Sequence, residues 1–374
     1  MIIFVQNQVS QLDEPVYARM CELDESSCHV IYWNDYGIKR KEIDPELGRA
    51  LNHADTLNYR YPYTWIDSRH HSWQKLYSET LALQPRLVVL SDIPRIARMK
   101  LALRLRANGI TVALRSDKNS LSDTANTGLY KFFEQALTRL IFNALAPISQ
   151  LTVQYYDWPK QRLCIPFPYT TNEKKFSPAM QIRLDGRKAI RKRFGLSKGD
   201  HVFLSAAKFV ERENPWEIIK SFENVQRTRP NAALIAIGDG PLFSGVKAYC
   251  KDRNIHRVFF PGYVPFAELQ DYFFAADTFL HFAKIEPWGV SPQDALIAGL
   301  GLITSVRVGS AQVHMTGPLN RFLIPLAQTE QYAERMIELS DQEDIYTLFE
   351  SARQSAQEFT TAACAERWVR DLRR

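Results

Sequence analysis

Two acidic residues flank an aromatic–glycine turn in the stretch KIEPWGVSPQDALIAG, residues 284–299. Glu286 precedes the turn, and Asp294 stands in the apolar run that follows it. Their carboxylates could accept hydrogen bonds from the hydroxyl groups of a sugar and of a ribose. The alternative is structural: Asp294 would complement a helix dipole and Glu286 would be a surface acid. The chemistry of this stretch alone favours neither interpretation.

The same stretch has the signature of a helix start. Proline is favoured at the first helical position and serine caps helices well, so Ser291 and Pro292 predict a helix over 292–299. The free backbone N–H groups there, around Gly289, Val290 and Ser291, suit an anion such as phosphate.

A basic junction occurs earlier, in SAAKFVERENPWEIIKSF (205–222). Lys208 and Arg212 come between an apolar run and a helical pattern, where the two cations could meet a diphosphate. A solvated basic loop is the structural alternative, and by itself it would be favoured.

Two turns complete the set. IAIGDGPL (235–242) puts Gly238 where a strand ends, which permits a tight turn and a close ligand approach. FFPGYVP (259–265) offers Tyr263 and Val264, which could flank a nucleobase. Each turn has a plain structural alternative, because parallel α/β domains contain such turns routinely.

Short apolar runs alternate with helical patterns along the whole chain, which predicts parallel α/β layers. Strands are expected at 2–6, 29–33, 86–90, 110–114 and 162–165, and again at 202–206, 232–237, 257–260, 278–282 and 301–305. Helices are expected at 214–229, 242–253, 266–275 and 292–299. Residues 166–180 contain three prolines and predict an interdomain linker. Two doubly wound domains should bind ligand at the carboxyl ends of their strands.

Residues 129–145 have apolar side chains at the 3.6-residue spacing of a helix that packs on a sheet. Arg95, Arg98, Lys100, Arg104 and Arg106 form the densest basic cluster. On a helical wheel they spread around the circumference, so we interpret this segment as a solvated helix, with membrane docking as the less favoured alternative.

Bulk properties exclude several classes. With 374 residues, 45% hydrophobic and 24% charged, the chain predicts a globular protein of about two domains without a transmembrane span. The five scattered cysteines indicate a reducing cytoplasm and no zinc site. No D-x-D occurs, so metal chemistry is not expected. The modest net charge of +6 is compatible with anionic ligands, and we expect no nucleic-acid partner.

Taken in order, AKFVERENP (207–215), IGDGPL (237–242), FFPGYVP (259–265), AADTF (275–279), EPWGVSPQDALIAG (286–299) and SVRVGSA (305–311) form a series. It resembles the donor-binding domain of retaining glycosyltransferases with the GT-B fold, in the family 4 group (glycosyl transferases group 1). The resemblance covers roughly residues 200–315, and the order of the motifs is more specific than any one of them.

The resemblance implies two Rossmann-like domains facing a cleft and a nucleotide-diphosphate sugar as donor, with no cofactor and no metal. Glu286 would contact the donor sugar, and Asp294 the ribose. Lys208 and Arg212 would neutralise the diphosphate, helped by the amides of residues 289–291. Transfer would proceed with retention, by front-face attack with the leaving phosphate as base. The family's habit implies a hexosyltransferase of bacterial surface polysaccharide, lipopolysaccharide or glycolipid synthesis. Its acceptor would be a glycan or lipid-linked glycan, and it would be cytoplasmic with peripheral attachment to the inner face of the membrane.

The N-terminal half carries a weaker resemblance. LRSDKNSL (114–121) is similar to an R-G-D-S-x-L motif, which implies that Arg115, Asp117 and Asn119 face the acceptor. The fold also implies an acceptor-side domain over 1–170, a donor domain over 178–356, and a C-terminal helix (357–374) that packs back on the first domain. NYRYPYTWIDSRHHSW (58–73) is a candidate acceptor contact, with an aromatic loop folded into the core as its alternative.

Departures from the family pattern leave a second hypothesis open. Glu213 stands where a basic residue is expected, Asp294 is one methylene shorter than the family's glutamate, and QNQVSQLDEP (6–15) replaces a glycine-rich loop. Of these differences, Glu213 and the missing glycine-rich loop motivate the second hypothesis, an inactive GT-B binding protein or partner subunit. A sugar-nucleotide epimerase of the same fold is a third, weaker option.

Overall fold

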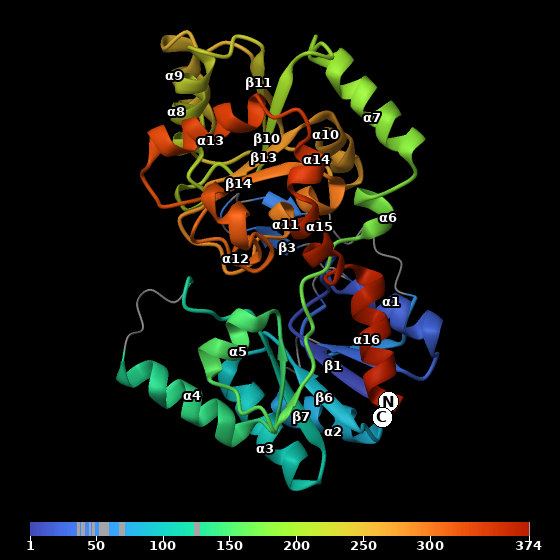
Figure 1. Cartoon of the computed structure of the whole chain (residues 1–374). Helices are drawn as coiled ribbons and strands as arrows, with labels where there is room; N and C mark the ends of the chain where they lie inside the picture. The colour runs from blue at the N-terminus through green and yellow to red at the C-terminus, as the bar shows by residue number, and fades with distance from the viewer. Residues whose placement is uncertain are drawn as a thin grey trace. The chain divides into compact units, whose positions relative to one another are not determined.

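The computed structural model describes residues 1–35, 38, 42–44, 46, 49–51, 60–66, 72–122 and 128–373. The chain forms two compact units (Figure 1). The first contains Met1–Asp44, Arg49–Thr170 and Phe359–Arg374. The second contains Pro45–Gly48 and Thr171–Glu358.

The described part of the first unit is built on a seven-stranded parallel sheet in the order β5-β2-β1-β6-β7-β8-β9. Successive side chains of a strand point to opposite faces, and both faces of β1 are apolar. Ile2 and Phe4 enter one core, whereas Ile3 and Val5 enter the other. The strands are β1 Ile2–Gln6, β2 Cys28–Tyr32, β5 Tyr63–Trp65, β6 Leu87–Leu90, β7 Thr111–Ser116, β8 Ala144–Pro147 and β9 Leu163–Cys164. A separate antiparallel pair joins β3 Glu42–Asp44 to β4 Arg49–Leu51.

Helices cover both faces of this sheet. The C-terminal helix α16 packs beside α1, and the Trp368 indole donates a 2.8 Å hydrogen bond to the Pro166 carbonyl. The segment after Phe359 therefore completes the first unit. The helices are α1 Glu14–Leu23, α2 Trp73–Ala82, α3 Arg95–Ala107, α4 Leu129–Ile141, α5 Gln150–Tyr156 and α16 Thr361–Arg373.

The described part of the second unit has a six-stranded parallel sheet in the order β12-β11-β10-β13-β14-β15. The chain builds outward from β10 to β12 and then crosses to the other side of β10 with β13. This reversal is the topological switch point, at whose carboxyl end ligands bind in doubly wound sheets. The strands are β10 His201–Ala206, β11 Ala232–Ile237, β12 Val258–Gly262, β13 Thr278–His281, β14 Gly301–Ser305 and β15 Leu323–Ile324.

The helices of the second unit pack on the two faces of its sheet around one apolar core. They are α6 Glu173–Phe176, α7 Met180–Arg193, α8 Pro215–Gln226, α9 Phe243–Asp252, α10 Leu269–Ala275, α11 Val290–Ala298, α12 Gly309–His314, α13 Thr329–Ser340, α14 Ile345–Leu348 and α15 Glu350–Gln357. Short 3-10 turns occupy Glu211–Glu213, Phe266–Glu268 and Gly317–Phe322.

The predicted fold class is confirmed, and two local predictions are wrong. The helix expected over 129–145 ends at Ile141, and its last residues instead form β8. The apolar stripe of that helix also faces solvent, since of its side chains only Thr138 and Ile141 are buried. Short β5 and β15 were not predicted, because two or three residues leave no period to detect.

Candidate functional site

The candidate site lies where the second unit's sheet reverses direction. Lys208 and Arg212 follow β10, and Glu286 follows β13, its neighbour in the sheet. The carboxyl ends of parallel neighbours lie at the same edge, so these three side chains start from adjacent loops. All three are partly exposed, so a ligand can reach them.

Hydrogen bonds tie these loops together. The Lys284 N–H donates to the Arg212 carbonyl at 2.7 Å, and the Asn214 side-chain amide donates to the Phe282 carbonyl at 3.2 Å. Asn214 adopts the left-handed conformation (φ 58°), which asparagine tolerates better than most residues. It thereby turns the chain into α8 directly after the basic pair.

Gly238 packs closely against the loop that carries Lys208. A Cβ atom at Gly238 would lie 1.9 Å from the Ala207 carbonyl oxygen, so only glycine fits there. The structure thus explains this glycine by the contact between the loops after β10 and β11. Its predicted contact with a donor ligand is a separate matter that this packing does not require.

A second set of hydrogen bonds fixes the loop that carries Glu286. The Glu286 carbonyl accepts from the Gly309 N–H at 3.1 Å, and Trp288 and Gly289 accept from the N–H and hydroxyl of Ser310, each at 2.7 Å. Gly309 is obligatory, because its Cβ would lie 2.0 Å from the Pro287 carbonyl oxygen. These backbone contacts hold the loop, and the Glu286 carboxylate itself accepts a 3.4 Å hydrogen bond from the Trp288 N–H.

Helix α11 starts earlier than predicted. Gly289 (φ 87°) is the residue that caps it, and the helix begins at Val290, so the predicted Ser291 cap and first-position Pro292 are wrong. The left-handed glycine turns the chain into the helix before Ser291 is reached. The N–H groups of Val290 and Ser291 fall in the first turn, where no intrahelical acceptor exists. The anion-binding character expected of this helix start is therefore retained.

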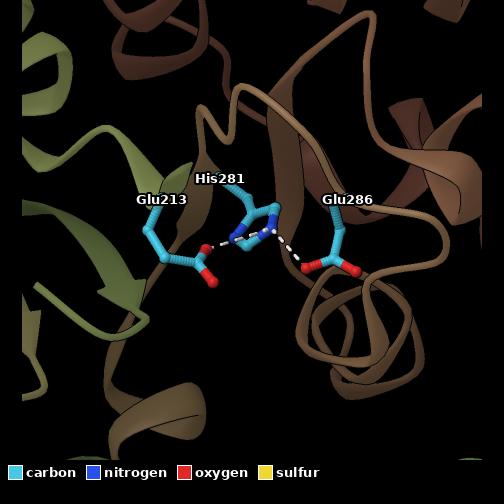
Figure 2. A group of neighbouring side chains, drawn as sticks. All are labelled: Glu213, His281 and Glu286. Atoms are coloured by element: carbon cyan, nitrogen blue, oxygen red, sulfur yellow. Dashed lines mark ion pairs between the residues drawn. The ribbon is translucent and has the colours of Figure 1, made fainter. Parts of the chain in front are cut away.

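A charge cluster with two buried members, Glu213 and His281, and partly exposed Glu286 links the two loops through the last residue of β13 (Figure 2). His281 Nε2 lies 3.8 Å from Glu213 Oε2 and 3.9 Å from Glu286 Oε2. The Arg212 guanidinium contacts the same acids, at 2.6 Å from Glu213 and 3.8 Å from Glu286. The acid at position 213 is therefore paired and turned inward.

The cluster sets the charge of its members. Burial raises the pKa of Glu213 and outweighs its cationic neighbours, His281 and Arg212. Burial alone would lower the pKa of His281, yet the adjacent Glu286 and Glu213 carboxylates hold it above its ordinary value. Burial opposes ionisation of Glu286 as well, but His281 and Arg212 keep the pKa of this carboxyl below its usual range. Glu286 is thus an ionised acceptor with a cationic neighbour on its inner side.

The basic pair already holds a carboxylate. Glu46, from the short Pro45–Gly48 segment of the second unit, lies 2.6 Å from Lys208 Nζ and 2.8 Å from Arg212 Nε. Hydrogen bonds from Arg212 and Lys208 lower the pKa of Glu46 to about 2. Lys208 and Arg212 can therefore bind one anionic oxygen group together.

Asp294 is placed differently from its predicted ribose role. It is buried, and its Oδ1 accepts a 2.6 Å hydrogen bond from the Thr171 hydroxyl. Thr171 in turn accepts from Gln293, whose side chain also accepts from the Trp288 indole. Burial raises the pKa of Asp294 to about 7. To bind a ribose, Asp294 would have to exchange this internal contact.

The predicted base-flanking residues differ in exposure. Tyr263 is exposed just beyond the end of β12, whereas Val264 is buried in the core. Tyr263 therefore offers an aromatic surface to a ligand, and Val264 fixes the turn from behind.

The three predicted acceptor-side residues have internal partners in the first unit. Arg115 is buried and pairs with Asp13 at 2.6 Å, and Asp117 accepts from the Tyr169 hydroxyl at 3.3 Å. Asn119 is buried, and its side-chain oxygen accepts from the backbone N–H groups of Leu121 and Ser122. These contacts shape the loop after β7. Of the other candidate acceptor stretch, 58–73, residues 58–59 and 67–71 lie outside the described part of the chain.

One group of metal-ligand types occurs in the described residues, namely Glu213, His281 and Glu286, with ligand atoms within 4.8 Å of one another. The Arg212 guanidinium lies 2.6 Å from Glu213 and 3.8 Å from Glu286, so both carboxylates already have a positively charged neighbour. We therefore interpret the group as a charge-balanced network.

Sequence reasoning missed Glu46, His281 and Thr171. His281 could have been found, because it ends the strand that leads into the Glu286 loop. Glu46 and Thr171 carried no signal, since their contacts join segments far apart in the sequence.

Residues 186–358 match the family model described as glycosyl transferases group 1. This range is somewhat less than half of the chain, and it contains the whole cluster around Glu286. The second unit is therefore a domain of this family, as the motif order predicted.

Curated relatives cover part of the chain. It is 25% identical over 124 residues to an alpha-monoglucosyldiacylglycerol synthase of Streptococcus pneumoniae, which is 33% of this chain and 28% of the relative. It is 24% identical over 181 residues to a GDP-mannose-dependent phosphatidylinositol monomannoside mannosyltransferase of Corynebacterium glutamicum, 46% of each chain. The matches span less than half the length of these relatives.

The likeness of fold extends over both units. HepE of Anabaena, solved with UDP and glucose, aligns over 100% of this chain and 99% of its own, with a TM-score of 0.71 and 13% identity. The chain thus has the GT-B fold.

Proposed function

We propose that this chain, whose second unit belongs to the glycosyl transferases group 1, moves a hexose from a nucleotide-diphosphate sugar to a glycan or glycolipid acceptor. The observation that carries the proposal is the convergence of Lys208, Arg212 and ionised Glu286 at the switch point of a GT-B donor domain. This arrangement places two cations beside one hydroxyl acceptor, as a sugar diphosphate requires.

Lys208 and Arg212 would neutralise the diphosphate as it leaves. The carboxylate of Glu46 shows that both cations can meet one oxygen anion, at 2.6 and 2.8 Å. The start of α11, at Val290 and Ser291, supplies further N–H donors and a positive helix end. With positive charge supplied by side chains and backbone, the proposed mechanism would need no metal.

Glu286 would accept hydrogen bonds from hydroxyl groups of the donor sugar. Its lowered pKa keeps it ionised at neutral pH, and its fixed backbone holds the carboxylate in place. Transfer would retain the anomeric configuration: the acceptor hydroxyl attacks from the face that the phosphate leaves, and the leaving phosphate oxygen takes its proton. The carbon–oxygen bond to the diphosphate breaks as the new glycosidic bond forms.

The nucleotide would lie toward Tyr263, whose exposed ring can stack on a base. A uridine diphosphate is the first candidate, because HepE of the same fold was solved with UDP. The Asp294–Thr171 pair would support the start of α11 beneath the nucleotide, with ribose contact dependent on release of Thr171.

A glycolipid acceptor is supported by the names of these two curated relatives, which refer to monoglucosyldiacylglycerol and to a phosphatidylinositol monomannoside. Synthesis of bacterial surface glycans or lipopolysaccharide would fit such an acceptor. The enzyme would then act in the cytoplasm, peripherally attached to the inner face of the membrane.

A second candidate function is a GT-B binding or partner subunit without activity. The observation that favours it is Glu46, which occupies both cations of the proposed diphosphate site. In that case Lys208 and Arg212 would stabilise the fold through Glu46 and would not bind a donor.

The test is release of nucleoside diphosphate from a panel of UDP- and GDP-sugars, without added acceptor. Wild type should hydrolyse at least one donor, and Glu286→Gln should be slower by about 100-fold or more, as for loss of a contact at the reacting sugar. Glu211→Gln is the matched control, an exposed acid in the loop beside the site. Anomeric NMR of the released sugar tests retention. Equal rates in wild type and Glu286→Gln would remove Glu286 from the mechanism.

A further inference from the structure

The outer surface of α4 is apolar. Leu129, Phe132, Phe133 and Leu140 lie on one stripe of this helix, and their side chains are 75%, 58%, 64% and 70% exposed. Single exposed apolar residues are common on protein surfaces, but a contiguous apolar stripe marks an interaction site.

The helix is held in this orientation by polar contacts on its inner side. Glu134 pairs with Lys118 at 2.6 Å and accepts from the Tyr155 hydroxyl at 2.9 Å. Near the end of the helix, Arg106 of α3 donates to the Ile141 carbonyl at 2.8 Å. These contacts, together with buried Thr138 and Ile141, fix α4 with its Glu134 side inward, so the apolar stripe is presented to the surroundings.

Helix α3 lies beside α4 and is strongly basic. The two helices are joined by Arg95, whose guanidinium donates to the Tyr130 hydroxyl at 3.2 Å, and by Arg106. The sequence of α3 contains no acid, and its exposed residues combine cations with apolar side chains, namely Arg95, Ile96, Lys100, Leu103 and Arg104. The apolar stripe therefore has a cationic border.

We propose that α4 docks on an anionic lipid bilayer. Its aromatic and aliphatic side chains would enter the headgroup region, while the cations of α3 meet lipid phosphates. Charge complementarity selects this occupant: a second copy of the chain would bring basic α3 surfaces against each other, whereas an anionic bilayer attracts them. In the described part of the chain no helix is long and apolar enough to cross a membrane, so α4 would lie along the surface.

This surface gives the peripheral attachment proposed above a specific location. It lies in the first unit, whereas the donor residues belong to the second. Vesicle binding needs no sugar transfer, so the docking proposal and the proposed reaction can fail independently.

The test is sedimentation with vesicles of phosphatidylcholine, with and without phosphatidylglycerol. Wild type should bind the anionic vesicles, and high salt should weaken the binding. For the double variant Phe132→Ser, Phe133→Ser, the affinity for these vesicles should fall at least about tenfold, because two inserted rings are lost. Both rings are exposed, so folding should be retained, which circular dichroism checks. The matched control is Ile182→Ser, Leu184→Ser on α7, where the side chains are similarly exposed (56% and 51%).

Three results would overturn the proposal. The first is equal binding of wild type and the Phe132, Phe133 variant to anionic vesicles, and the second is no binding by either protein. The third is a dimeric wild type and a monomeric double variant in sedimentation velocity, with no difference between them in vesicle binding. That outcome would assign the face to a second copy of the chain.

Discussion

His281 Nε2 lies 3.9 Å from Glu286 Oε2 and 3.8 Å from Glu213 Oε2, so one buried imidazole pairs with two carboxylates. The distances are those of ion pairs. An imidazolium between them compensates one negative charge and holds the pKa of Glu286 below its usual range against the effect of burial. His281 is thus a positioning residue for the acid expected to contact the sugar.

The first prediction concerns this imidazole. His281→Asn removes a cation next to Glu286, so the pKa of Glu286 should rise and less of it should be ionised at low pH. The acid limb of the kcat profile should move to higher pH by about one unit. The control is His201→Asn, a buried histidine at the opposite end of β10. An acid limb that stays in place in His281→Asn would contradict the link.

The second prediction concerns Glu46. If its carboxylate competes with the donor diphosphate, Glu46→Gln should bind a nucleoside diphosphate more tightly, by about three- to tenfold, because partly exposed ion pairs are weak. Calorimetry with wild type and Glu46→Gln measures this. Weaker binding in the variant would show instead that Glu46 organises the basic pair for its ligand.

The third prediction is a stability profile for Asp294. Its folded pKa of about 7 lies above the unfolded value of about 4. The folded protein therefore holds this proton more tightly, and the resulting stability is complete at low pH and is lost as pH rises from about 4 to 7. Asp294→Asn should abolish that decline and be more stable than wild type at about pH 8, by up to about 4 kcal/mol. Urea unfolding of both proteins across this range is the measurement, and parallel profiles would contradict it.

The fourth prediction is that donor hydrolysis needs no metal. Arg212 lies against both acids of the Glu213–His281–Glu286 cluster, so a divalent cation there would meet a positive charge. EDTA should leave the rate unchanged, and added Mn²⁺ or Mg²⁺ should not raise it severalfold. A rate that collapses with EDTA and returns with one cation would assign the cluster to that metal.

The second unit could be predicted from the sequence because its signals are local. The order of motifs predicted the family, and the loops after β10 and β13 do bring Lys208, Arg212 and Glu286 to neighbouring strand ends. The predicted start of α11 was wrong because Gly289 adopts a left-handed conformation and caps the helix, which the sequence alone does not reveal.

Other features depend on contacts between distant segments. Periodicity located the apolar stripe of α4, but it cannot say which way a stripe faces, and polar anchors such as Glu134 turn it outward. Likewise, the burial of Asp294 follows from Thr171, which is remote in sequence. Motif resemblance had suggested a ribose contact for an acid that the structure pairs internally.

A nucleotide-sugar site at Lys208 and Arg212 is tested most directly by calorimetric titration of UDP and GDP into wild type and Lys208→Met. Wild type should bind at least one of them with 1:1 stoichiometry. Lys208→Met should weaken that binding by about 10- to 100-fold, the effect of losing a charge-assisted phosphate contact. Absence of binding to folded wild type at about millimolar ligand, or equal affinity in Lys208→Met, would contradict a nucleotide-sugar site at this basic pair.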